Sequence, residues 1–131
     1  MTQIIDIASA TPARERIQAW LADFEAALAA RDIDAASEMF ANDSYWRDLM
    51  AFTGSVNTVE GPDEAGDLLG ESLGHVAVYG FKTIEEPICI DGFAEAWVSF
   101  ETTAGPGRGH LRVKDEMAWT FLTTLQESGD R

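Results

Sequence analysis

Basic residues, cysteine and long apolar runs are all scarce in this chain. Only nine of its 131 residues are Lys or Arg, against 23 Asp and Glu, so the formal net charge is −14. A surface of this sign repels the phosphates of nucleic acids and the headgroups of anionic lipids. Cys89 is the single cysteine, which excludes an internal disulfide and fits a reducing compartment. No apolar run approaches the roughly 20 residues of a membrane span, and no secretion signal is recognisable. We therefore expect a cytoplasmic protein with neither nucleic acid nor membrane as partner.

Motifs that hold phosphates, dinucleotides and metals are also missing. The sequence contains no Walker A loop and no GxGxxG fingerprint. His75 and His110 lie far apart and belong to no HExxH or cysteine-containing motif, so no metal-ligand pattern is present. We expect neither a metal nor a cofactor.

Three helices are predicted in the first half of the chain. Apolar residues at helical spacing predict a long amphipathic helix over 13–30. Asp32 is suited to cap a second helix over 33–40, and Gly61 with the following proline begins a third. The chain is 46% hydrophobic and long enough for one domain with a core of its own.

The second half of the chain changes to the alternation typical of strands. A first strand is expected at 44–52, and GPGRG is expected to form a hairpin turn. Helices followed by an antiparallel meander indicate an α+β domain. We expect this domain over 11–126, with flexible ends at 1–10 and 127–131. The strands of the meander are predicted at 75–79, 82–90, 93–103, 109–114 and 117–126.

The strand SYWRDLMAF carries the main candidate for a catalytic group. Strand alternation places Trp46, Asp48 and Met50 on one face. Burial disfavours the charged form of a carboxyl group, so an inward-facing Asp48 is suited to proton exchange as a general base. The alternative is structural: Asp48 pairs with Arg112 or Lys114, or lies in water at the rim.

Further candidates for ligand contact each have a structural alternative. Trp97 is expected in a pocket wall or in a dimer contact, and His110 in a ligand site or on an ordinary strand surface. Arg112 is suited to clamp an acidic group or to pair with the abundant carboxylates. Trp20 and Phe24 are expected in the core, part of which would also line a pocket.

The helix corner ARDIDAASEMFANDS, a strand, a third helix and a meander resemble the nuclear transport factor 2-like superfamily, which includes ketosteroid isomerases and SnoaL-like polyketide cyclases. The resemblance implies a cone-shaped α+β barrel, whose curved antiparallel sheet wraps around the long N-terminal helix with two further helices. It also implies an apolar ligand pocket and places Asp48 on the position of the general base. The isomerases have an oxyanion-binding Tyr where this chain has Phe24, and a protonated Asp near Gly109. Both donors are missing here, so steroid isomerisation is not expected unless His110 or Trp97 supplies a different donor.

A narrower resemblance concerns WRDLMAFT and GHLRVKDEMAWTFLTTL. These strings are similar to the amino-terminal domain that precedes the FAD-binding module in bacterial and fungal flavin-containing monooxygenase-like proteins. The missing GxGxxG fingerprint means that this chain is not expected to hold FAD itself.

Three functions therefore remain open. The first is a small-molecule-binding domain with an apolar pocket, accessory to a flavoprotein. The second is a stand-alone isomerase, cyclase or hydrolase with Asp48 as base. The third is a non-catalytic dimerisation module. A homodimer is expected in each case, because one sheet face is left uncovered and carries Trp97.

Overall fold

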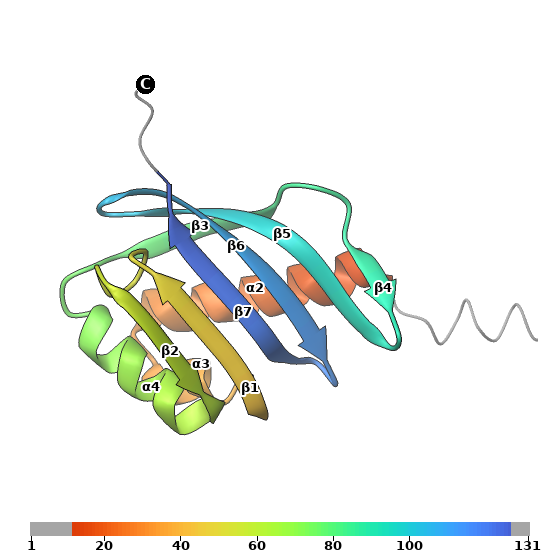
Figure 1. Ribbon diagram of the computed structural model, residues 1–131, viewed down its shortest axis with the longest axis horizontal. Coiled ribbons are helices and arrows are strands. Elements are labelled where there is room, and N and C mark those ends of the chain that lie inside the picture. The colour runs from red at the N-terminus through yellow and green to blue at the C-terminus, as the bar shows by residue number, and fades with distance from the viewer. Residues whose placement is uncertain (1–11, 127–131) are drawn as a thin grey trace, which may run out of the picture.

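The computed structural model describes residues 12–126, which form three helices and seven strands (Figure 1). The predicted flexible ends at 1–10 and 127–131 lie outside the described residues. No helix between residues 12 and 126 combines the length and apolar character needed to cross a bilayer. The helices are α2 (Ala13–Ala30), α3 (Ile33–Ser37) and α4 (Gly61–Ser72). The strands are β1 (Phe40–Leu49), β2 (Val56–Glu60), β3 (Val78–Thr83), β4 (Ile88–Ile90), β5 (Phe93–Thr102), β6 (Gly105–Lys114) and β7 (Met117–Leu125).

The long helix α2 begins and ends where the sequence predicts. Its buried side chains recur at three- and four-residue spacing and form one stripe towards the sheet. The helix ends at Ala30, and the next residue, Arg31, caps it: its left-handed conformation (φ 57°) lets its N–H donate to carbonyls of the last turn. The second helix is shorter than predicted and ends at Ser37, because the carbonyl of Met39 already accepts a sheet hydrogen bond from Ala118.

The sheet is open and mixed, which corrects the prediction of an antiparallel barrel. Its strand order is β2-β1-β7-β6-β5-β3, with β4 paired to β5. The meander β5-β6-β7 is antiparallel as predicted, but β1 lies parallel to β7. Strand β1 follows two helices and pairs with β7, the last strand of the chain. Its direction in the sheet is therefore set by contacts between distant segments and not by its local sequence. The edge strands β2 and β3 are not neighbours in this order, so the sheet does not close.

Four local predictions are wrong. The strands predicted at 75–79 and 82–90 are not found with these bounds, because β3 runs from Val78 to Thr83 and β4 covers only Ile88–Ile90. Strand β2 was not predicted, because its residues alternate only between half-buried and exposed positions at the sheet edge. The expected strand 44–52 ends at Leu49, since Met50 has a positive φ of 80° and turns the chain. GPGRG is part of β6 and not a turn; the chain reverses at 103–104 instead.

The space between α2 and the inner face of the sheet is filled by aromatic rings. Trp20 stacks on Phe24 with ring centroids 4.6 Å apart, and Trp46 stacks on Phe40 at 5.3 Å. Figure 1 shows α2 crossing behind the strands, with α3 and α4 at the β1–β2 end. This interior is a packed core, and the hollows described below lie at its edge. The large rings of the core are Trp20, Phe24, Phe40, Trp46, Phe52, Phe100 and Phe121.

Candidate ligand-binding site

Asp48 lies on the inner face of β1 and is completely buried. Its carboxylate accepts hydrogen bonds from four groups. The backbone N–H of Phe52 lies 3.0 Å from both carboxylate oxygens. The N–H and the hydroxyl of Thr53 each lie 2.9 Å from Oδ2, and the hydroxyl of Thr123 lies 2.6 Å from Oδ1. The sequence predicted apolar surroundings for Asp48, whereas in the structure hydrogen-bond donors surround its carboxylate.

These contacts join the first and last strands to the loop at 50–55. The indole N–H of Trp46 donates to Thr123 Oγ1 at 2.9 Å, so the Thr123 hydroxyl proton is directed to Asp48. The expected pairing of Asp48 with Arg112 is wrong, because Arg112 on β6 forms an ion pair with Glu95 at 2.9 Å. Asp48 instead binds the backbone N–H groups of Phe52 and Thr53 and so holds the loop at 50–55 against β1.

The loop at 50–55 folds back over the end of the sheet. Met50 and Ser55 close it through a backbone hydrogen bond of 2.9 Å. Phe52 is buried and meets the indole of Trp46 edge-on at 4.9 Å. The side-chain amide of Asn57 donates to the Thr53 hydroxyl at 2.9 Å. The Thr53 hydroxyl thus connects the buried carboxylate with the surface above it.

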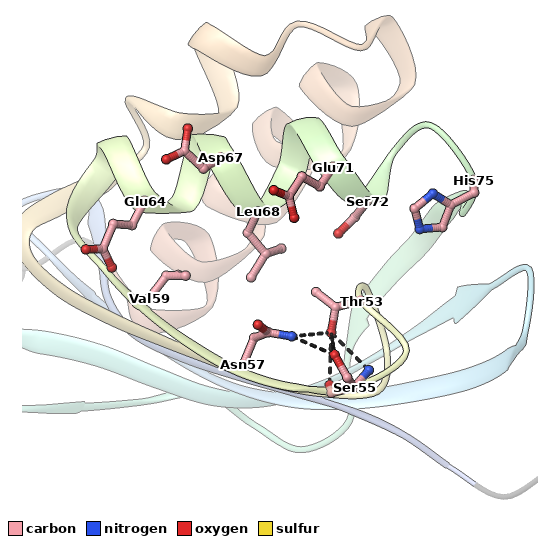
Figure 2. A pocket seen from close by; sticks show the side chains of 10 residues that line it. All are labelled: Thr53, Ser55, Asn57, Val59, Glu64, Asp67, Leu68, Glu71, Ser72 and His75. Atoms are coloured by element: carbon pink, nitrogen blue, oxygen red, sulfur yellow. Dashed lines mark hydrogen bonds between the residues drawn. The ribbon is translucent and has the colours of Figure 1, made fainter.

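A cleft of about 380 Å³ opens between this loop, β2 and α4; we call it the α4–loop cleft. Its volume lies within the range of about 300–1,000 Å³ that small-molecule sites occupy. Figure 2 shows Leu68, Glu71 and Ser72 reaching down from α4, with Thr53 and Asn57 on the opposite wall. The lining residues are Thr53, Ser55, Asn57, Val59, Glu64, Asp67, Leu68, Glu71, Ser72 and His75.

A second hollow of about 230 Å³ adjoins the cleft, and we call it the apolar hollow. Thr53 and His75 line both spaces, so the two hollows meet at these residues. The two neighbouring hollows therefore differ in character: the α4–loop cleft is polar and acidic, and the second hollow is apolar. The apolar hollow is lined by Met50, Ala51, Phe52, Thr53, Gly54, His75, Val76, Thr103 and Ala104.

Two polar groups of the cleft differ in how well they are satisfied. Glu64 accepts a hydrogen bond from the N–H of Glu60 at 2.8 Å, which caps the start of α4. Ser72 is 1% exposed, and its Oγ has no hydrogen-bond partner among the described residues. Within residues 12–126 no group of three or more His, Cys, Asp or Glu side chains is arranged to hold a metal ion.

The predicted site residues fall into separate regions. Trp20, Phe24 and Trp46 belong to the aromatic core with Asp48 beside them, and their rings contact one another. Met50 is 46% exposed and lines the apolar hollow. Met50 was predicted on the strand, but it lies in the turn after β1, and this turn brings its side chain to the apolar hollow.

The other three predicted residues lie on the outer face of the sheet. Trp97 is cross-strand neighbour to His110, and the two rings meet at 4.7 Å. The guanidinium of Arg108 lies 5.2 Å from the Trp97 ring, and Arg112 pairs with Glu95 as above. The structure does not bring these residues together with Asp48, because strand alternation points them to the opposite side.

His110 has a lowered pKa. Partial burial is the main cause, and Arg112 adds to it, while Glu95 acts in the opposite direction. The charged residues beside it are Glu95 on β5 and Arg108 and Arg112 on β6, and uncharged Leu122 faces it from β7.

This shift predicts a pH effect on stability. Between the lowered pKa and the ordinary histidine pKa of 6.5, the unfolded chain binds more protons at this site than the folded chain. The contribution of His110 to the free energy of unfolding is therefore complete above pH 6.5 and declines as the pH falls through this window. His110→Gln should remove the decline, as measured by urea unfolding on both sides of pH 6.5. A constant difference between wild type and variant across the window would contradict this assignment.

The comparisons with known proteins concern the fold. No protein-family model matches the chain, and neither does any curated protein. A domain of unknown function with a cystatin-like fold from Nostoc punctiforme is 12% identical, with a TM-score of 0.72 over 90% of this chain and 80% of that one. A second cystatin-like protein from the same organism is 16% identical, with a TM-score of 0.66 over 88% and 92% of the two chains.

A third solved structure carries a ligand. It is a hypothetical protein with a ketosteroid isomerase-like fold from Catenulispora acidiphila, in complex with trimethylamine. It is 14% identical, with a TM-score of 0.60 over 83% of this chain and 86% of that one. These likenesses show the fold alone. They support the α+β class expected from the nuclear transport factor 2-like resemblance, with the mixed, open sheet described above.

The sequence prediction did not include the residues of the α4–loop cleft. The third helix was predicted from its start at Gly61, and in the structure its residues Ala65, Leu68 and Leu69 are buried. One signal was available: GESLG at 70–74 has GxSxG spacing around Ser72. In the structure this serine ends a helix and does not sit on a strand-to-helix turn, so it is not a nucleophile elbow.

Proposed function

We propose that this chain is a small-molecule-binding domain whose ligand occupies the α4–loop cleft and the apolar hollow. The observation that carries the proposal is the meeting of the two hollows at Thr53 and His75. A ligand pocket typically combines apolar walls with a few polar groups, and these two spaces together provide both. The ligand expected from the sequence was a small apolar or weakly polar molecule, and the cleft adds charged groups to that description.

The packing of the interior supports this location. The predicted pocket residues Trp20, Phe24 and Trp46 are at most 3% exposed and contact one another as rings. A ligand placed among these three rings would have to displace their contacts. The cleft is already open, and the hydrogen bonds to Asp48 fix its floor in place. The trimethylamine complex of the Catenulispora acidiphila protein is a second support, because it shows a small organic molecule bound to a protein of this fold.

A tryptophan placed in the cleft provides the test. Ser55 is exposed and lines the cleft, whereas Thr58 is exposed on neighbouring β2 and does not line it. In Ser55→Trp the indole should fill the cleft and abolish binding of small organic fragments detected by NMR. Thr58→Trp should bind as wild type does. Fragment binding that survives Ser55→Trp, with shifts confined to core residues, would contradict the proposed site.

An enzymatic role for Asp48 is the second candidate. It is favoured by one contact: Thr53, whose hydroxyl donates a hydrogen bond to Asp48, lines both hollows. On this alternative wild-type protein would exchange protons of a bound ketone with solvent, and Asp48→Asn would abolish that exchange in addition to the loss of stability argued below. The first candidate expects the same loss of stability but no such exchange in wild type.

We also propose that the domain forms a homodimer. The outer face carries Trp97, 39% exposed, and Tyr79, 51% exposed, which suits contact with a second copy. Sedimentation at micromolar concentration should show a dimer, and a result of monomer alone would contradict the proposed dimer.

We also propose a cytoplasmic location. The resemblance of WRDLMAFT and GHLRVKDEMAWTFLTTL further leads us to propose a role beside a flavin-binding module.

A further inference from the structure

The acidic residues of α4 have no basic partners. The helix carries Asp63, Glu64, Asp67 and Glu71 and no Lys or Arg. Among residues 12–126, no ion pair involves any of these four carboxylates. Like charges three or four positions apart on a helix repel one another. Three of the four acids line the α4–loop cleft, so this cleft carries uncompensated negative charge.

A buried hydroxyl adds an independent observation. Ser72 is 1% exposed, lines the cleft, and has no hydrogen-bond partner for its Oγ among the described residues. Burying a hydroxyl without a partner is destabilising. Figure 2 shows its oxygen pointing from α4 towards the loop, on the same side as the Glu71 carboxylate. A ligand with hydrogen-bond donors in the cleft would satisfy both groups.

The chemistry of the two hollows narrows the ligand class. Carboxylates around an unpaired hydroxyl favour a cation that donates hydrogen bonds. A metal ion needs several ligands around one point, and the part of the chain that the structure describes provides no such group. The adjoining space is walled by Met50, Phe52 and Val76, among others, which favours an apolar group next to the charge. The net charge of −14 attracts cations at long range as well.

We propose that the site selects a protonated amine that carries an apolar group. The ammonium lies in the α4–loop cleft against Ser72 Oγ and the Glu71 carboxylate, and the apolar group lies in the hollow beside Met50 and Val76. The inference rests on the proposed function, because it names the ligand class of the same site.

The test compares probes that share a six-carbon chain. Hexylammonium, hexanol and hexanoate are titrated into the protein at low salt and followed by NMR at the amides of the cleft. Hexylammonium should bind on the order of tenfold more tightly than hexanol, and hexanoate more weakly still. Calcium chloride serves as a probe for a metal site and should not displace hexylammonium at matched ionic strength.

Three variants separate contact from overall charge. Ser72→Ala should weaken hexylammonium binding about fivefold, while its midpoint of thermal unfolding is unchanged or higher because an unpartnered hydroxyl is removed. Glu71→Gln should weaken binding by at least as much. Asp63→Asn removes the same charge from the same helix, but Asp63 does not line the cleft, so binding should be retained.

The possible failures are distinguishable. Equal affinity for hexanol and hexylammonium at the cleft would overturn the amine inference and leave the proposed function standing. Calcium binding that Glu71→Gln abolishes, with displacement of the amine, would overturn it in favour of a metal. Equal losses in Glu71→Gln and Asp63→Asn would also overturn it, because they would show a screening effect of charge alone. Absence of any probe from the cleft would overturn both proposals.

Discussion

Asp48→Asn is expected to lower the free energy of unfolding by about 3–5 kcal/mol, because four donors converge on the buried carboxylate. The substitution keeps the size of the side chain but turns an NH₂ group towards N–H and O–H groups. At least one donor from Phe52, Thr53 or Thr123 then loses its acceptor. Urea unfolding followed by tryptophan fluorescence measures the change.

Asp43→Asn is the matched control for this prediction. Asp43 lies on the same strand and is exposed, so the change should stay within about 0.5 kcal/mol. Equal unfolding free energies for the two variants would show that the donors around Asp48 do not hold the loop at 50–55.

Gly109→Ala is expected to lower the free energy of unfolding by about 3 kcal/mol. A Cβ at this position would lie 2.5 Å from the carbonyl oxygen of Leu122 and 3.3 Å from a methyl group of Val98. The carbonyl belongs to β7, which pairs with β6, so it cannot move without disturbing the ladder. Thermal unfolding followed by circular dichroism would measure the loss.

Gly70→Ala provides the control for a glycine without such a neighbour. It lies in α4, and an added Cβ would meet nothing within 4 Å. Because alanine is the better helix former, this variant should gain roughly 0.5–1 kcal/mol. If Gly109→Ala were as stable as wild type, the close packing of β6 on β7 described here would be wrong.

The elements that the sequence predicts well are those with a strong local signal. Helix α2 repeats its apolar residues over 18 positions, so both of its ends are predicted correctly. The alternation around Trp46 likewise predicts the burial of Asp48, which is 0% exposed. What alternation does not predict is the polar environment of Asp48, because Thr123 comes from the far end of the chain.

The parts that the sequence does not predict depend on contacts between distant segments. The parallel pairing of β1 with β7 joins the first and last strands, and no local pattern specifies it. The glycines of GPGRG indicate a turn locally, yet Gly107 and Gly109 are needed where the neighbouring side chains and backbone leave no room for a Cβ. Apart from Met50, none of the residues predicted for the site lines the cleft or the apolar hollow, because the two form only when the loop at 50–55 folds back towards α4.

The most direct measurement for the central claim is an NMR search for intermolecular NOEs between hexylammonium and the protein. NOEs are expected from the probe to the His75 ring and the Thr53 methyl group, because these two residues line both the cleft and the apolar hollow. NOEs to the indoles of Trp20 and Trp46 instead would place the ligand inside the aromatic core and contradict the account.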